Sequence, residues 1–334
     1  MILYDPRAHL HLLEYGIMIP VHDSRVYRTL QALGATDLAR PPACLETTIT
    51  ETISRSDVER VHAPTYTRRF FGEDAELEAL ALAGFELVNP DGSYHRYDPA
   101  QARRPISDLR NPILMGCAGT WQTCLRALDR GFAYFLGGGN HHAHADHGWG
   151  FCLLNEIVIA ARKLLAEGKA GRIWIIDIDA HKGDGTAALC RDDPDIATFS
   201  IHMAEGWPLD PETRARLPAS APCFGPSTVD VEMRPGEDSR YLAALAEGLA
   251  RFERIAGPAD LAIVVDGADP YEHDELPSTA TMRLSLDQCF ERDRLVLDFL
   301  RQRRMPSAWL MAGGYGQRSW EVYSRFLASV LAES

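Results

Sequence analysis

The sequence predicts an α/β protein built on a doubly wound parallel sheet. Short runs of apolar, β-branched and aromatic residues alternate with helical patterns along the chain. These runs are almost continuously apolar, as expected for central strands that are covered on both faces. Alternation of such strands with helices is typical of a parallel sheet. No linker rich in Pro, Gly or Ser divides the 334 residues, so we predict one domain over 1–334.

The elements follow in chain order. Five runs predict strands, at 132–138, 172–178, 196–202, 261–267 and 307–314. Helical patterns lie between them at 152–167, 239–255 and 287–304. Asp287 is a good N-cap for the last helix, which should end before Pro306. Residues 1–110 contain Pro41-Pro42 and a loop signature at 89–99. There we expect helices and rim loops, whereas 111–334 carries the motifs.

The composition excludes several classes of function. The net charge is 34 − 47 = −13, which disfavours nucleic acids and anionic membranes as partners. No apolar run reaches the roughly 18 residues of a membrane span, and the N-terminus lacks a signal-peptide pattern, so we predict a cytoplasmic protein. The seven cysteines are scattered without a CxxC pair, which argues against disulfides and a Cys-based zinc site.

Polar residues follow four of the predicted strands. The segments are "NHHAHADHGWGFC", "DIDAHKGDG", "DGADPYEHD" and "AGGYG". Ligands of open parallel sheets bind outside the carboxyl ends of the strands. One aspartate at such a position is usually a helix cap, but four polar strand ends together favour an active centre.

The segment "DIDAHKGD" predicts a metal site. Side chains two residues apart share a face of an extended chain, so Asp177, Asp179 and His181 can converge. Oxygen and imidazole donors suit Zn²⁺ or Fe²⁺. Asp269, from another strand end, could complete a three-ligand set with the open position that a catalytic metal needs. On its own, His181 would be interpreted as a core histidine.

Acid–base chemistry is assigned to the adjacent His141 and His142. Asp177 and Asp184 are available as orienting partners, and a His–Asp dyad has the basicity and fixed tautomer of a general base. Two glycines would present Tyr315, whose phenol could donate to a developing oxyanion.

Three residues near this centre are interpreted as structural. We expect His144 and His147 to be loop residues without a catalytic role. Cys152 is interpreted as a small buried hydrophobe.

The motifs "GGGNHHA…GWGFC", "DIDAHKGDG", "GAD" and "GGYG" together resemble the zinc-dependent histone deacetylase family from about Leu114 to the C-terminus. The resemblance implies the arginase/deacetylase fold, a single eight-stranded parallel sheet flanked by helices, with the active site at the C-terminal strand ends. "DIDAH" followed by a non-histidine and "ERDRLVLDFLRQRRMPSAWLMAGGYGQRS" resemble the class IV branch most closely. We expect a bacterial member.

The resemblance also implies a role for each catalytic residue. His142, oriented by Asp184, would be the general base and then the general acid, and His141, paired with Asp177, would be an electrostatic partner. Tyr315 would be the oxyanion donor.

The family pattern further implies residues that bind metals and substrate. The zinc ligands would be Asp179, His181 and Asp269. A structural K⁺ would be held by Asp177, Asp179, the His181 carbonyl and Ser200. The substrate would meet the Gly150 carbonyl, Phe151, Trp207 and Leu276.

The predicted function is therefore zinc-dependent removal of acyl groups from the ε-amine of lysine in proteins or peptides. The sequence departs from the family pattern at Lys182, where many members have a second histidine, and at Pro277, where a glycine is usual. These departures put the acyl preference in doubt, not hydrolysis.

Three alternatives remain open. The first is an acetylpolyamine deacetylase of the same fold, although Leu276 stands where polyamine-selective relatives carry glutamate. The second is an arginase-type enzyme with two Mn²⁺ ions. It would need an aspartate two residues after His181, whereas Asp184 follows by three. The third is a protein that binds acyl-lysine without hydrolysing it. The presence of a residue at every catalytic position argues against this alternative.

Overall fold

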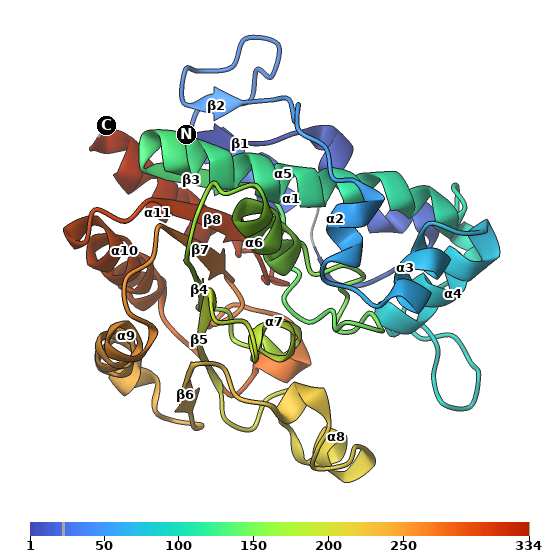
Figure 1. Cartoon of the computed structure of the whole chain (residues 1–334). Coiled ribbons are helices and arrows are strands. Elements are labelled where there is room, and N and C mark those ends of the chain that lie inside the picture. Colours follow the sequence, from blue (N-terminus) through green and yellow to red (C-terminus); the bar gives the residue numbers. More distant parts are fainter. Residues whose placement is uncertain (22–23, 334) are drawn as a thin grey trace.

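The centre of the molecule is an eight-stranded sheet in which every strand pair is parallel (Figure 1). The computed structural model describes residues 1–21 and 24–333. The strand order is β2-β1-β3-β8-β7-β4-β5-β6. The strands are β1 Ile2–Leu3, β2 Leu45–Glu46, β3 Phe132–Phe135, β4 Ile173–Asp177, β5 Ile196–Met203, β6 Val229–Met233, β7 Leu261–Asp266 and β8 Ser307–Met311. The predicted eight-stranded parallel sheet is thereby confirmed.

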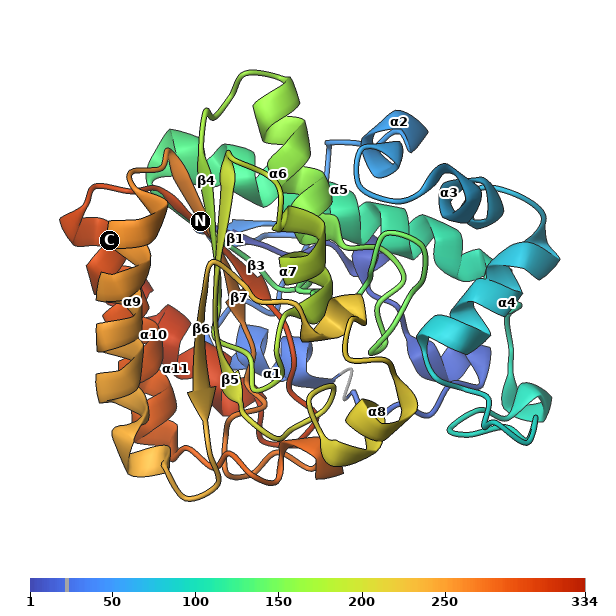
Figure 2. The same ribbon diagram turned by 60° about the horizontal axis from the view of Figure 1, so that its bottom comes forward.

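Helices cover both faces of the sheet (Figure 2). One face packs against α1 Ser24–Ala32, α9 Tyr241–Ala256, α10 Leu286–Gln302 and α11 Trp320–Ala332. The other packs against α5 Arg110–Arg130, α6 Glu156–Ala166 and α7 Asp184–Cys190. Beyond α5 lie α2 Arg55–Glu59, α3 Pro64–Phe70 and α4 Asp74–Gly84, and α8 Pro211–Arg216 follows β5. Short 3₁₀ helices occupy Pro6–Ala8, Leu12–Tyr15, Pro99–Gln101, Ile106–Leu109, Pro222–Phe224, Asp238–Arg240 and Pro277–Thr279.

Strand β4 explains why the strand sequences are apolar throughout. Ile173 and Ile175 enter the core under α5 and α6, whereas Trp174 and Ile176 enter the core under α9 and α10. All four side chains are fully or almost fully buried. A strand covered on both faces has no solvent side on which polar residues could alternate.

Several predicted elements are confirmed and others were missed. All five predicted strands and all three predicted helices exist, with ends shifted by up to four residues. Strands β1, β2 and β6 and helices α5, α7, α8 and α11 were not predicted. The predicted N-cap of α10 was wrong. Ser285 caps this helix, because its Oγ accepts from the Gln288 N–H while the Gln288 side chain accepts from the Ser285 N–H.

The strand order determines which loops meet. Strands β3, β8, β7 and β4 are consecutive neighbours, and because they are parallel their carboxyl ends lie at one edge. The loops that follow them carry His141, Tyr315, Asp269 and Asp179, which are far apart in the chain. No helix in the described ranges is long and apolar enough to cross a membrane.

Candidate active site

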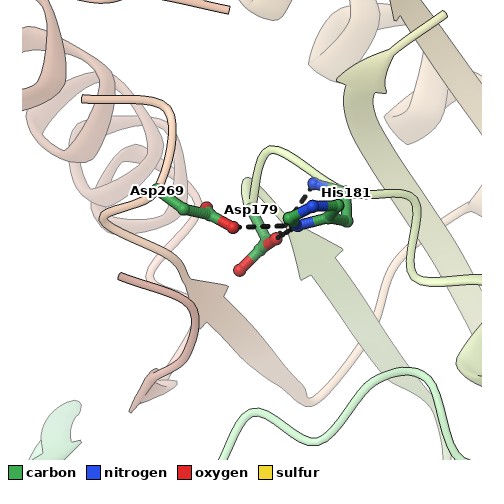
Figure 3. Close-up of side chains that lie close together, drawn as sticks. All are labelled: Asp179, His181 and Asp269. Atoms are coloured by element: carbon green, nitrogen blue, oxygen red, sulfur yellow. Dashed lines mark hydrogen bonds and ion pairs between the residues drawn. The ribbon is translucent and has the colours of Figure 1, made fainter. Parts of the chain in front are cut away.

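Asp179, His181 and Asp269 form a buried cluster at this edge (Figure 3). One potential ligand atom from each residue lies within 4.8 Å of the other two. His181 Nδ1 is 2.9 Å from Asp269 Oδ2 and 3.3 Å from Asp179 Oδ1. The structure thus brings together the three residues that the sequence predicted as metal ligands.

Backbone amides fix both carboxylates. Asp179 Oδ1 accepts from the His181 N–H at 3.0 Å, and Oδ2 accepts from the Gly313 N–H at 3.0 Å. Asp269 Oδ1 accepts from the Ala180 N–H at 2.9 Å. The loops after β4, β7 and β8 are therefore joined through the carboxylates of Asp179 and Asp269, which orients these side chains toward one point.

The glycines of "GAD" and "AGGYG" are required because the backbone there passes very close to the carboxylates of the cluster. A Cβ at Gly267 or at Gly313 would collide with the Asp179 carboxylate. At Gly313 it would also lie 2.6 Å from Asp269 Oδ2, closer than real Cβ atoms approach other heavy atoms. Only glycine lets these backbones pass beside the two carboxylates.

The electrostatics of the cluster fit a divalent cation. Burial and the neighbouring Asp179 raise the pKa of Asp269 to about 7. Burial opposes charge on His181, but hydrogen bonds to Asp179 and Asp269 outweigh it and raise the pKa to about 10. Two buried carboxylates thus attract positive charge strongly, and their oxygens with an imidazole nitrogen are a donor set suited to zinc. His181 Nε2 lies 3.0 Å from Ser278 Oγ, which holds the ring with Nδ1 toward the carboxylates.

Two His–Asp dyads lie beside this cluster. His141 Nδ1 is 2.7 Å from Asp177 Oδ2, and His142 Nδ1 is 2.6 Å from Asp184 Oδ1. Burial lowers the pKa of His141, but the carboxylates of Asp177 and Asp179 outweigh burial and raise it to about 9. Burial, followed by the adjacent His141, lowers the pKa of His142 to about 4. Near neutral pH, His142 is therefore the neutral member of the pair.

His144 is more than the loop residue that the sequence analysis expected. It is buried, and its Nε2 lies 2.8 Å from the second oxygen of Asp184. Asp184 thus orients two imidazoles, those of His142 and His144. The two-residue spacing of these histidines was the available signal, since such residues share a face of an extended segment. His147 is half-exposed and pairs with Asp146 on the surface.

A cavity of about 250 Å³ opens above the cluster. Its lining includes most of the residues that the sequence analysis proposed, namely His142, Gly150, Phe151, His181, Trp207, Leu276 and Tyr315. The Trp207 ring lies 4.7 Å from the His142 ring, and the Phe151 ring lies 6.1 Å from the Tyr315 ring. A Cβ at Gly150 would be 2.5 Å from His142 Cδ2, so this backbone crosses directly over the histidine. The arrangement is a narrow tunnel with aromatic walls that reaches His181 of the cluster that could hold a metal ion.

Comparison with known proteins agrees with this geometry. The family model described as "Histone deacetylase domain" matches residues 19–332. The chain belongs to the histone deacetylase family. An uncharacterized protein of Picosynechococcus is 34% identical over 213 residues, which are 64% of this chain and 65% of that protein. Histone deacetylase 2 of Arabidopsis thaliana is 29% identical over 63% of this chain and 51% of its own length.

Two further relatives complete the comparison. The acetoin utilization protein AcuC of Bacillus subtilis is 29% identical over 59% of this chain and 50% of its own length. The matched region thus spans about half to two thirds of these relatives. A crystal structure of the HDA15 HD domain covers all of this chain and 91% of that domain, with a TM-score of 0.68 at 17% identity. At that identity the likeness supports the fold alone.

In this histone deacetylase family member, four residues that line the tunnel were not predicted from the sequence. Glu86 and Arg96 line the same cavity, as do Pro277 and Ser278. Glu86 and Arg96 come from the N-terminal region, whose loops were expected at the rim but not assigned residue by residue. No periodicity or motif in the sequence marks either one.

Asp274 was also missed, although it connects two loops of the site. Its Oδ2 accepts from the Tyr315 N–H at 2.7 Å. Its Oδ1 accepts from the Leu276 N–H at 2.9 Å and from the Thr279 hydroxyl at 3.0 Å. One carboxylate therefore holds both the tyrosine loop and the loop that carries Leu276.

Arg292 supports the site from the opposite side of the strand ends. Its fully buried guanidinium donates from Nη1 to the carbonyls of Ile178, at 3.0 Å, and Gly267, at 2.7 Å. It also pairs with Asp266 and Asp293. Ile178 directly precedes Asp179, so Arg292 ties the end of β4 to the end of β7.

The residues of the predicted potassium site lie close in the sheet. Asp177 of β4 is opposite Ser200 of β5 in the strand register. Ser200 Oγ is 2.9 Å from His202 Nδ1. Lys182 is buried with its Nζ 2.9 Å from Asp230 Oδ2. The potassium assignment stays a prediction.

Proposed function

We propose that this protein is a zinc-dependent hydrolase that removes acyl groups from the ε-amine of lysine in proteins or peptides. The observation that carries the proposal is the buried Asp179, His181 and Asp269 cluster, whose His181 lines the same cavity as His142 and Tyr315. Fe²⁺ is the other metal that this donor set admits. Family membership supports deacetylation in general, and the site supports the finer assignment.

The metal would be held by Asp179, His181 and Asp269, where it supplies polarisation of the amide carbonyl and a lowered pKa of water. The dyad with Asp184 engages His142 Nδ1, which leaves Nε2 to accept a proton from the attacking water. Because burial and the adjacent His141 lower its pKa to about 4, His142 is neutral and ready to act as a base. The proton then passes from Nε2 to the leaving amine.

Two other groups complete the proposed reaction. The Tyr315 hydroxyl donates a hydrogen bond to the oxyanion, and the Gly150 carbonyl accepts one from the substrate amide N–H. His141, whose pKa Asp177 helps to raise to about 9, stays protonated and adds positive charge beside the oxyanion. The aromatic walls Phe151 and Trp207 match the methylene chain of a lysine side chain.

The remaining assignments belong to the same proposal. We assign a structural K⁺ to Asp177, Asp179, the His181 carbonyl and Ser200. The predicted substrate is an acyl-lysine protein or peptide, not a nucleic acid or a membrane, and the predicted setting is the cytoplasm of a bacterium. The class IV relationship also remains a prediction.

One observation favours the runner-up, an acetylpolyamine deacetylase. Glu86 lines the tunnel and could attract a cationic amine chain. However, burial raises the pKa of its carboxylate, and the Gly150 amide and the Trp149 side chain offset this only in part. Leu276, at the position where a glutamate would select polyamines, is buried and apolar. We therefore favour acyl-lysine substrates.

The decisive experiment compares the two substrate classes with purified, zinc-loaded protein. A panel of acyl-lysine peptides with short to long acyl groups is assayed beside acetylspermidine and acetylputrescine. We expect a higher kcat/KM for acyl-lysine peptides. Faster hydrolysis of acetylpolyamines than of every peptide in the panel would overturn the proposal and favour an acetylpolyamine deacetylase.

A further inference from the structure

The mouth of the tunnel carries an arginine that no part of the reaction uses. Arg96 is half-buried and lines the tunnel cavity. Its guanidinium carbon lies 5.6 Å from the centre of the Phe151 ring, in a cation–π contact. Within residues 1–21 and 24–333 the guanidinium makes no ion pair and no hydrogen bond, although Glu86 in the same cavity interacts with it electrostatically. Among those residues nothing occupies its donors, so a group that enters the tunnel can bind them.

The backbone at Arg96 is held firmly in an unusual conformation. Its φ is +51°, in the left-handed region that side-chain-bearing residues seldom adopt. The Met18 N–H donates to the Arg96 carbonyl at 2.8 Å, and the flanking Tyr97 pairs with Ile17. Glu86, at φ +56°, and Phe151, at φ +66°, line the same cavity in the same conformation. Strained residues of this kind gather at ligand sites because the surrounding contacts impose them.

The mouth carries charges of both signs, because Glu86 and Arg96 line the same cavity and interact electrostatically. Glu86 is the acidic residue of the tunnel lining, and it is engaged by Gly150 and Trp149. A wider groove of about 920 Å³ shares Glu86 and Trp207 with the tunnel but does not include Arg96 or Phe151. That groove contains three more acidic residues and one arginine, namely Glu205, Asp210, Glu212 and Arg216. The positive charge of Arg96 thus stands on the Phe151 wall, apart from the acidic groove.

We propose that Arg96 is a specificity-determining residue that binds a carboxylate of the substrate at the tunnel mouth. The inference rests on the proposed hydrolysis of acyl-lysine and names a substrate class within it, namely acyl-lysine compounds with a negative charge beyond the side chain. A free α-carboxylate is the simplest such group. A planar guanidinium can donate two parallel hydrogen bonds to a carboxylate, and its stacking on Phe151 fixes the plane in advance. The same positive charge repels an acetylpolyamine.

The test uses two substrates that differ only in charge, Nα,Nε-diacetyl-lysine and its methylamide. For the wild-type, zinc-loaded protein we expect kcat/KM for the acid to exceed that for the amide about tenfold, equivalent to about 1.4 kcal/mol. Arg96→Gln should bring the ratio close to one by lowering kcat/KM for the acid more than for the amide. Arg96→Gly removes the side chain in a residue that accepts φ +51° without strain, and it should give the same ratio. Arg216→Gln, at an exposed arginine of the acidic groove, is the matched control and should keep the wild-type ratio.

Each outcome decides between the two proposals. A wild-type ratio of one or below, or a ratio that survives both Arg96 variants, would overturn the carboxylate site while hydrolysis itself stands. Failure of the wild-type protein to hydrolyse either compound or any acyl-lysine peptide would instead remove the proposed function. Calorimetric binding of the products, Nα-acetyl-lysine and its methylamide, makes the same charge comparison without turnover. Tighter binding of the acid by wild type than by Arg96→Gln supports the site, and equal binding contradicts it.

Discussion

The floor and the mouth of the tunnel are built in different ways. At the floor, Asp179 and Asp269 come from the ends of neighbouring central strands, and each carboxylate is held by backbone amides. At the mouth, Glu86 and Arg96 come from the loop after α4 and stand on left-handed backbone. The order of the strands in the sheet positions the side chains at the floor, whereas the conformation of one loop positions those at the mouth.

This difference indicates which part of the molecule can vary. A substitution at the floor disturbs several strand-end loops at once, because one carboxylate bonds to more than one of them. A substitution at the mouth acts first on the surface that a substrate meets. We therefore expect effects on turnover to be large at the floor and effects on selectivity to be modest at the mouth.

The strongest test of the floor removes a predicted metal ligand. Asp179→Ala or His181→Ala should abolish hydrolysis and reduce bound zinc to well below one ion per chain, because a three-ligand site loses a donor. Zinc content is measured by elemental analysis beside activity. Asp146→Ala, at an exposed aspartate outside the tunnel, is the control and should keep both. Full zinc occupancy in both variants would contradict the assignment of Asp179 and His181 as metal ligands.

A second test separates chemistry from metal binding. Tyr315→Phe should lower kcat by about 10² or more with zinc retained, since it removes one oxyanion donor. His142→Ala should lower kcat at least as much, because it removes the base. A zinc-chelating hydroxamate should still bind the Tyr315 variant, and Tyr94→Phe, at an exposed tyrosine, should leave kcat unchanged. Near-full kcat in Tyr315→Phe would contradict the oxyanion role.

A third test lies between floor and mouth, at Ser278. Its hydroxyl contacts Nε2 of His181, so Ser278→Ala should weaken metal affinity about tenfold or more while kcat at saturating metal changes less. Competition with a chelator measures the affinity. Ser329→Ala, at a serine on α11 that bonds only within its helix, provides the control. Unchanged affinity would show that Ser278 does not hold the ring.

The smallest expected effect lies at the mouth. Leu276→Glu should shift the kcat/KM ratio of acetylpolyamines to acyl-lysine peptides toward polyamines about tenfold, or about 1.4 kcal/mol of differential transition-state binding. Leu13→Glu, at a leucine with 68% of its surface exposed, adds the same charge elsewhere and should not change the ratio. A ratio that moved equally in both variants would exclude a local role for Leu276.

The contrast between floor and mouth also explains what could be predicted from the sequence. The residues Asp179, His181 and Asp269 follow long apolar strands, so their convergence can be inferred from the strand ends alone. Strands β1 and β2 span two residues each, too few for a periodic pattern. The role of Arg292 could not be predicted because this residue lies on a helix. Only the packing of that helix shows that its guanidinium reaches two strand-end carbonyls. Left-handed backbone at Glu86 and Arg96 has no sequence marker, since neither residue is a glycine.

Asp274 links the floor of the tunnel to its mouth, so the sequences of these two regions cannot change independently. Its carboxylate holds the amide of Leu276 at the mouth and the amide of Tyr315 beside the chemistry. A change in loop 270–280 that suits a new substrate therefore also moves the anchor of the phenol. Over evolutionary time, gains in substrate range at this loop should be paired with compensating changes around the tyrosine. Among the described residues, no hydrogen bond joins the loop at 85–97 to Tyr315, so changes in that loop leave the anchor of the phenol in place.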